Sequence, residues 1–241
     1  GPADIGRNGE SVMTGEEGLK QLLPNLWSFV DTCHVYVIRD GNEAVVIDFG
    51  SGDVLTPLRS LGTTPRWVLH TCYHRQQCQG DHLLAKLGCK IAVPEWEAEY
   101  FTRADEFWQH RPLFNIMVTA RMSGISVRNI EIAQTLNDYE TFHWHNYSFR
   151  VIPTPGYTPG SISLVTEIDG RRVVFCGGLL SGSGTIPSLR GTQWTYGGPE
   201  GIVTTIRSLE EIEQEEPDLV LPSIGEHITD LPAEVRTLKD R

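Results

Sequence analysis

The sequence predicts an α/β (α+β) fold, specifically a four-layer αββα sandwich in which two β-sheets pack face to face between outer helices. Three observations support this prediction. Each half of the chain begins with strand patterns and continues with helical ones. Turn residues such as Asp169-Gly170 separate neighbouring strands, and no low-complexity linker divides the halves. We therefore expect the two halves to form one domain.

In the first half, short apolar or alternating segments predict strands at residues 26–30, 33–38, 44–47, 67–70 and 90–93. Apolar residues at helical spacing predict helices at residues 54–61, 81–87 and from 95 to about 122. The last helix carries more aromatic residues than one packing face needs, so a lid or a partner surface stays open as an alternative to simple packing. These aromatic residues are Trp96, Tyr100, Phe101, Phe107, Trp108 and Phe114.

The second half begins near Ile130 and repeats the order of strands before a helix. Its strand patterns cover residues 141–153 as a pair, 161–166, 172–176 and 219–222. A helix is expected at residues 200–213, followed by the last of these strands. The acidic residues around Glu210 to Glu216 are interpreted as the solvated face of this helix.

Charge and composition exclude some classes of protein. The chain has 20 Lys and Arg against 31 Asp and Glu, a net charge of −11, which argues against binding to nucleic acid. No apolar run approaches the ~20 residues that a membrane-spanning helix needs, so no membrane contact is expected. The five Cys are an odd number without a paired framework, which is typical of free thiols in a reducing compartment. We therefore expect a cytoplasmic protein.

The N-terminus indicates a fragment of a longer polypeptide. Gly1-Pro2 is typical of the remnant that a cleaved tag leaves, and the first Met is Met13. We expect one domain over residues 3–241, taken from a larger protein.

Five segments in order along the chain carry a family resemblance. They read V-I-D-F-G at 46–50, V-L-H-T-C-Y-H-R-Q-Q-C-Q-G at 68–80, T-P-G-Y-T-P-G-S at 154–161, V-F-C-G-G-L at 174–179 and L-P-S-I-G at 221–225. They resemble the landmark motifs of the metallo-β-lactamase superfamily, which span nearly the whole chain. The resemblance implies the αββα fold and a pair of metal ions that activate a water for hydrolysis of an ester, amide or phosphodiester.

The central metal-binding motif of that family is altered in this chain. Cys72 stands at the position of the first His of the T-H-x-H-x-D-H motif, and His74 keeps the second. Gln76 and Gln77 replace the Asp and the following His. A neutral amide is a poor ligand for a dication compared with carboxylate or imidazole, so the resemblance leaves at most Cys72 and His74 as metal ligands.

The three remaining family ligands are also replaced. Tyr157 stands where the family has the His of its T-P-G-H turn, and its phenol, with an unperturbed pKa of ~10, binds metal only after a costly deprotonation. Gly178 stands where the Asp that bridges the two metals belongs, and it has no side chain. Ile224 replaces the final His with an apolar group. The dinuclear mechanism implied by the family is therefore not expected here.

We predict a non-hydrolytic pseudoenzyme that keeps a vestigial cleft for a ligand or an interaction. Its partner would be a small polar ligand, a neighbouring domain or another protein, and no cofactor is expected. The predicted lining of this cleft is Cys72, His74, Gln76, Gln77, Tyr157, Gly178 and Ile224. An architectural or oligomerisation domain is one alternative.

A hydrolase with one zinc ion is the other alternative. Cys72 and His74 would hold the ion, helped by His227 or by a His from the pair His143 and His145. The last two alternate around Trp144 and are expected on one face of a strand. A Cys–His nucleophilic pair made of Cys72 and His74 is also conceivable chemically, although no third group that would orient it is identifiable.

Two further groups of residues near the motif have more than one interpretation. Asp48 is interpreted as a turn or helix-capping carboxylate, with support of the metal ligands as the alternative. His70, Cys78 and His82 lie close to Cys72 and His74 in sequence, but their spacing matches no standard zinc motif. His82 is expected on the helix that follows, packed or facing solvent.

Overall fold

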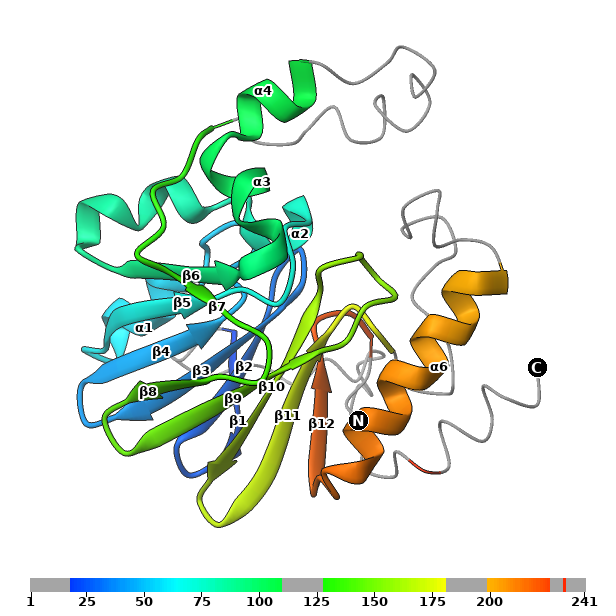
Figure 1. Cartoon of the computed structure of the whole chain (residues 1–241). Coiled ribbons are helices and arrows are strands. Elements are labelled where there is room, and N and C mark those ends of the chain that lie inside the picture. Colours follow the sequence, from blue (N-terminus) through cyan, green and yellow to red (C-terminus); the bar gives the residue numbers. More distant parts are fainter. Residues whose placement is uncertain (1–17, 110–127, 181–198, 226–231, 233–241) are drawn as a thin grey trace, which may run out of the picture.

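Two β-sheets packed face to face form the centre of the molecule. The computed structural model describes residues 18–109, 128–180, 199–225 and 232 (Figure 1). One sheet holds seven strands in the order β1 (Leu19–Leu23), β2 (Leu26–Val30), β3 (His34–Asp40), β4 (Glu43–Ile47), β5 (Thr64–Leu69), β6 (Lys90–Pro94) and β7 (Gln134–Leu136). The other holds five in the order β12 (Leu219–Pro222), β11 (Arg171–Gly177), β10 (Ile162–Ile168), β9 (Tyr147–Pro153) and β8 (Thr141–Trp144).

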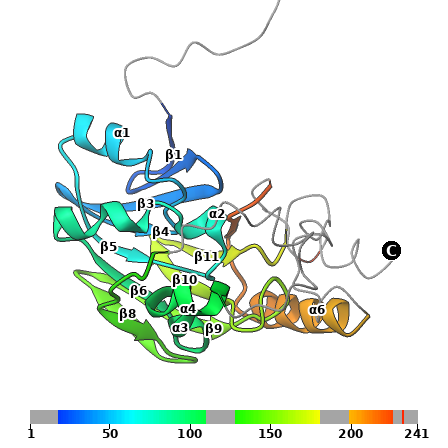
Figure 2. The ribbon, with the colours of Figure 1, turned by 90° about the horizontal axis from the view of Figure 1, so that it is seen from above.

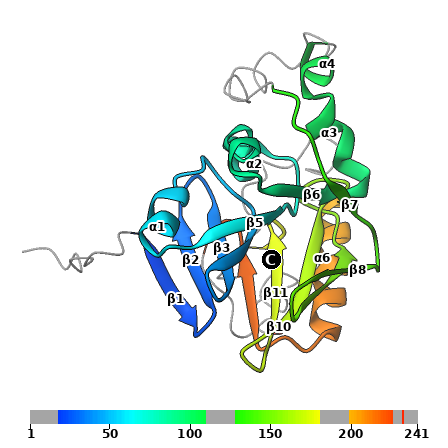
Figure 3. The same cartoon turned by 90° about the vertical axis from the view of Figure 1, so that its left-hand side faces the viewer.

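Helices cover the outer face of each sheet. The seven-stranded sheet carries α1 (Leu55–Ser60), α2 (Arg75–Cys78), the 3₁₀ turns η1 (Asp81–Leu83), η2 (Ala85–Leu87) and η3 (Glu95–Glu97), and α3 (Ala98–Thr102). Helix α4 (Ala104–Gln109) follows α3 and extends away from the sheets (Figure 1). The long helix α6 (Pro199–Gln214) packs on the five-stranded sheet. Figures 2 and 3 show α1 and α6 on opposite sides of the two sheets. The predicted four-layer αββα architecture is confirmed.

Three separate hydrophobic clusters fill the three spaces between the four layers. In β4 the side chains alternate between them: Ala44 and Val46 face the helices, while Val45 and Ile47 face the other sheet. This alternation follows from the period of two in a strand, and both faces are apolar because both are covered. The third cluster joins the five-stranded sheet to Leu209 and other residues of α6.

Two predicted elements differ in the structure. The predicted helix at 81–87 is the pair of 3₁₀ turns η1 and η2, which end at Gly88 with φ +66°. In this segment Leu84 is buried, whereas Leu83 and Leu87 are exposed. The segment therefore lacks the apolar face that would stabilise a longer α-helix. The predicted helix from Glu95 is divided into η3, α3 and α4, and its part beyond residue 109 lies outside the described residues.

Two strands, β1 and β7, were not predicted from the sequence. Both lie at the outer edges of the seven-stranded sheet, and β7 has three residues. Edge strands have a weaker sequence pattern because they are short and partly solvated. Among the described residues, no helix has the length and apolar character needed to cross a membrane.

Candidate functional site

The positions predicted from the motifs meet at one edge of the two sheets, the upper edge in Figure 1. They follow the ends of β4, β5, β11 and β12, with α2 and the turn between β9 and β10 beside them. Gln77 in α2 is bonded to Ser223 after β12, and Tyr157 in the turn contacts Gly178 after β11. The fold therefore brings together residues that are far apart in the sequence.

The ring of Tyr157 lies against Gly178 and occupies the space that a side chain at this position would need. A Cβ atom built on Gly178 would lie 2.4 Å from Cδ1 and 2.5 Å from Cγ of Tyr157. Tyr157 is buried, with 4% of its surface exposed. Its ring centroid lies 4.5 Å from that of His74, and its hydroxyl donates a hydrogen bond to Oε1 of Gln76 at 3.3 Å.

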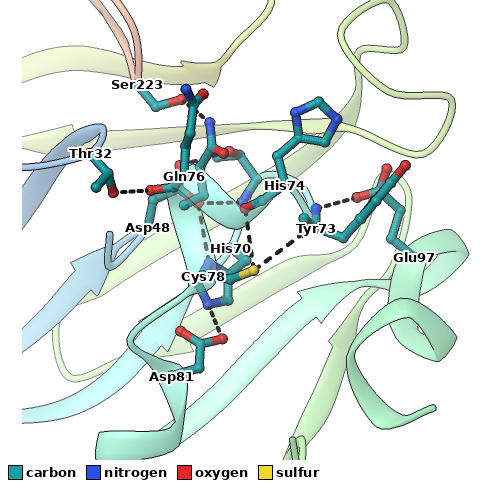
Figure 4. Close-up of polar contacts among 12 residues, drawn as sticks. Thr32, Asp48, His70, Tyr73, His74, Gln76, Cys78, Asp81, Glu97 and Ser223 are labelled. Atoms are coloured by element: carbon teal, nitrogen blue, oxygen red, sulfur yellow. Dashed lines mark hydrogen bonds and ion pairs between the residues drawn. The ribbon is translucent and has the colours of Figure 1, made fainter. Parts of the chain in front are cut away.

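Helix α2 is fixed in place by bonds to three neighbouring segments, two of which are represented by Thr32 and Ser223 in Figure 4. The buried side chain of Gln77 donates from Nε2 to Oγ of Ser223 at 3.1 Å. The Gln77 carbonyl accepts hydrogen bonds from the amides of Phe49 and Gly50, at 2.8 and 2.9 Å. Thr32 donates to the Gln76 carbonyl at 2.7 Å. Gln77 is therefore an internal connection of the fold, whereas Gln76 is exposed and accepts hydrogen bonds at its main-chain and side-chain oxygens.

Cys72 and Tyr157 are poorly suited to bind a metal ion, because both would have to lose a proton in a buried environment. Cys72 is completely buried, and burial, followed by the negative charge of Glu97, raises the pKa of its thiol well above the ordinary value. Burial also raises the pKa of Tyr157, so both groups keep their protons. His74 is half-buried between aromatic rings and Ile224 is half-buried after the last strand. Within the described parts of the chain, no three His, Cys, Asp or Glu side chains are grouped so as to hold a metal ion.

A buried network of His70 and two carboxylates lies beneath these residues (Figure 4). His70 is fully buried, with Nε2 2.7 Å from Oδ2 of Asp81 and Nδ1 3.3 Å from Oδ1 of Asp48. Asp48 also accepts hydrogen bonds from the amide and the hydroxyl of Thr71, at 3.0 and 2.7 Å. Its interpretation as a turn or helix cap was wrong, because its oxygens reach across to the segment after β5.

The charge of His70 follows from this environment. Burial alone lowers the pKa of an imidazole, but the charge of Asp81 and the hydrogen bonds to Asp48 and Asp81 outweigh it. The pKa of His70 rises to about 10, so the ring is a cation at neutral pH. The network joins the ends of β4 and β5 to η1.

Glu97 is a third buried carboxylate and connects η3 to the segment after β5 and to the turn between β9 and β10. It accepts hydrogen bonds from the Tyr73 amide at 2.8 Å and from the Thr158 hydroxyl. Its side chain also packs against Gly160, where an added Cβ would lie 2.6 Å from Cγ of Glu97. Burial raises the pKa of Glu97 to about 7, although the hydrogen bonds oppose this shift.

We expect Glu97 to make stability depend on pH in the acidic range. Its folded pKa lies above the unfolded value of ~4.3, so its contribution is complete below that value and is lost as the pH rises through about 7. The free energy of unfolding of the wild type, relative to Glu97→Gln, should therefore decrease between about pH 4.5 and 7. Urea titrations of both proteins at several pH values measure this difference. A difference that is constant across the range would contradict the prediction.

The pair His143 and His145 does not join the site. His143 contacts Oγ of Ser148 at 3.0 Å, and His145 lies 2.8 Å from a carboxylate oxygen of Asp40. The prediction that His143 and His145 share a strand face was wrong, because β8 ends at Trp144 and His145 turns the chain with φ +49°. His82 is exposed after the motif, and His227 lies outside the described residues.

Comparison with known proteins shows the family to which the chain belongs. A family model described as the metallo-beta-lactamase superfamily matches residues 29–223. The chain belongs to the metallo-β-lactamase superfamily. A hydroxyacylglutathione hydrolase of Anaeromyxobacter dehalogenans (strain 2CP-C) is 26% identical over 140 residues, which cover 57% of this chain and 43% of that protein. The chain therefore matches less than half the length of this superfamily relative.

Solved structures of superfamily members share the fold. A metallo-β-lactamase family protein from Thermus thermophilus has a TM-score of 0.67 at 20% identity, covering 91% of this chain and 80% of that one. A metallo-β-lactamase with a HARLDQ motif from Cronobacter sakazakii has a TM-score of 0.66 at 15% identity, covering 92% and 94%. A class B3 di-zinc metallo-β-lactamase from an Alaskan soil metagenome has a TM-score of 0.65 at 14% identity, covering 96% and 95%.

The residues described at this edge do not fit the two metal ions that the superfamily motifs hold. Tyr157 takes the space beside Gly178, where the motif places a bridging carboxylate. Gln77 uses its side-chain amide to bond Ser223.

Three residues of the site were missed by sequence analysis, namely Asp81, Glu97 and Ser223. Asp81 follows the motif directly, so a search for carboxylates near His70 could have found it. Nothing in the sequence distinguishes Glu97 from its exposed neighbours.

Proposed function

We propose that this chain is a non-hydrolytic member of the superfamily, a pseudoenzyme that acts as an interaction module. The edge of the sheets that carries the superfamily motifs serves here as part of the folded core. Its residues connect loops to one another, and binding to a partner takes over as the function.

The observation that carries this proposal is the contact between Tyr157 and Gly178. Gly178, at the bridging position of the motif, has no side chain. A Cβ atom added there would lie 2.4 Å from Cδ1 of Tyr157, which is too close for two carbon atoms. A single substitution at a metal-ligand position removes a ligand but leaves a space for the ion. Here Tyr157 and Gly178 together place an aromatic ring in the space beside residue 178. This arrangement supports the loss of the whole metal centre.

The hydrogen bonds of the site support the same proposal. Gln77 is completely buried and bonded to Ser223, and the Tyr157 hydroxyl is bonded to Gln76. These bonds join the motif segments to one another, and the Gln77 side-chain oxygen, which has no hydrogen-bond partner among the described residues, is neutral and therefore a poor ligand for a dication. A mononuclear hydrolase would rely on Cys72, and the burial that raises the pKa of its thiol opposes the thiolate that zinc requires.

Metal content tests the proposal. We expect protein purified without chelator and then dialysed against zinc to hold less than about a tenth of an equivalent of zinc, iron or manganese. The matched control is a variant with the six superfamily ligands restored, Cys72→His, Gln76→Asp, Gln77→His, Tyr157→His, Gly178→Asp and Ile224→His. If it folds, this variant should take up zinc under the same conditions.

One equivalent of metal in the wild-type protein would overturn the proposal if it disappeared in Cys72→Ser combined with His74→Ala. Elemental analysis by mass spectrometry measures the metal directly. Circular dichroism of each variant confirms that a loss of metal does not come from unfolding.

A further inference from the structure

Two large aromatic side chains are exposed on the same region of the surface. Trp96 in η3 is 71% exposed, and Tyr139 in the turn between β7 and β8 is 61% exposed. The Trp96 indole donates a hydrogen bond at 3.1 Å to Oδ2 of Asp138, the residue next to Tyr139. This bond joins two segments that are 42 residues apart and fixes the Trp96 ring at the surface. We name Trp96, Asp138, Tyr139, Glu140 and Glu211 the aromatic patch.

The backbone of Tyr139 indicates that its side chain is there for a reason other than folding. Its φ is +62°, a left-handed conformation that Gly or Asn adopts readily and that costs a bulky residue ~1 kcal/mol. Burial of the ring would offset that cost, but the side chain is mostly in water. Strain of this kind without compensating packing is typical of functional positions.

The surroundings of the two rings are acidic. Asp138 and Glu140 flank Tyr139 in the chain, and Glu211 of α6 interacts with the Tyr139 hydroxyl. Desolvation, followed by the negative charges of Glu211 and Asp138, raises the pKa of the Tyr139 phenol. Arg207 lies one turn before Glu211 on α6 and offsets one of these charges. The patch remains net negative.

We propose that the aromatic patch binds a Lys- or Arg-rich segment of a partner protein. Cationic side chains stack on the faces of Trp and Tyr rings and gain further from nearby carboxylates, which is the combination present here. The net charge of −11 on the whole chain attracts such a segment and disfavours a second copy of this acidic chain as the partner. The inference rests on the proposed interaction role and adds the chemistry of the partner.

Fluorescence anisotropy of labelled octalysine and octaarginine tests this inference with the whole chain at low ionic strength. We expect Trp96→Ala and Tyr139→Gly each to weaken binding about tenfold. Tyr139→Gly is the sharper variant because Gly suits φ +62° and should not harm the fold. Trp96→Phe keeps an aromatic face and should retain part of the affinity.

Two control variants separate the patch from the general charge of the protein. Glu213→Gln with Glu216→Gln removes two carboxylates away from Tyr139, since residue 213 lies on the opposite side of α6 from residue 211. Val30→Ala removes a side chain that is 72% exposed on β2, towards the other edge of the seven-stranded sheet. Both controls should change the affinity less than about twofold.

Three results would overturn the inference. They are no binding of either peptide, equal loss in the patch and control variants, and self-association of the wild type that Trp96→Ala abolishes in size-exclusion chromatography. None of these results alters the metal content of the protein. The peptide-binding measurement therefore tests the aromatic patch, and the metal content separately tests the pseudoenzyme proposal.

Discussion

Replacing Gly178 with Ala is expected to destabilise the protein by about 3 kcal/mol, the upper part of the range for overpacking a core. The added Cβ would lie 2.4 to 2.6 Å from three atoms of the Tyr157 ring. The ring has little freedom to move, because it is 4% exposed and packs against His74. Equilibrium unfolding in urea, followed by circular dichroism, measures the loss.

A double-mutant cycle assigns this loss to the ring. In the Tyr157→Ala background, the effect of Gly178→Ala should fall below about 1 kcal/mol, because the clashing atoms are gone. Gly62→Ala gives the size of a purely conformational cost: its φ is +62° with no atom within 4 Å of the added Cβ, so we expect a cost of about 1 kcal/mol, less than the steric overlap at Gly178. An equal loss from Gly178→Ala in both backgrounds would show that the ring does not fill this space.

Replacing His70 with Gln is expected to cost about 3 to 5 kcal/mol, the usual effect of removing one partner from a buried ion pair. Asp48 and Asp81 are both 1% exposed, and Gln cannot supply the positive charge between them. His145→Gln is the matched control, because the side chains of His145 and Asp40 are 39% and 42% exposed. An exposed pair is screened by water, so this control should cost less than about 1 kcal/mol.

The effect of His70 should depend on pH in a defined direction. Its folded pKa of about 10 lies above the unfolded value of ~6.5, so its stabilisation is complete below the unfolded value and is lost as the pH rises through the folded one. The difference in unfolding free energy between wild type and His70→Gln should therefore shrink between about pH 7 and 10. A difference that does not change over this range would contradict a charged His70.

The fold could be predicted because its signals are local. Alternating residues such as Val45, Val46 and Ile47 define a strand, and the turn residues of the T-P-G-Y-T-P-G-S segment are required by the backbone. The prediction that the family ligands are replaced also needed only the identity of each residue, and it stays a prediction. These two parts of the prediction required no distances.

The network of the site could not be predicted, because it depends on which side chains meet across loops. Gly178 was predicted to stand at the position of a metal ligand, but no sequence pattern indicates that the Tyr157 ring lies in the space beside it. Glu97 falls in a segment whose helical periodicity expects a polar residue to face solvent, and the turn around Thr158 covers it instead. His70 acquires its charge only from the Asp48 and Asp81 side chains that folding brings to it.

The contact between residues 157 and 178 also constrains the order in which the ancestral site can have changed. A carboxylate at 178 and the present ring at 157 cannot occupy the same space, so under the pseudoenzyme proposal the acidic side chain was lost before the new ring was acquired or together with it. The reverse path is equally restricted, since Asp at 178 is tolerated only after Tyr157 has been replaced. The aromatic ring therefore makes the change hard to reverse, because a chain that carries Tyr157 cannot regain a ligand at 178 by a single substitution.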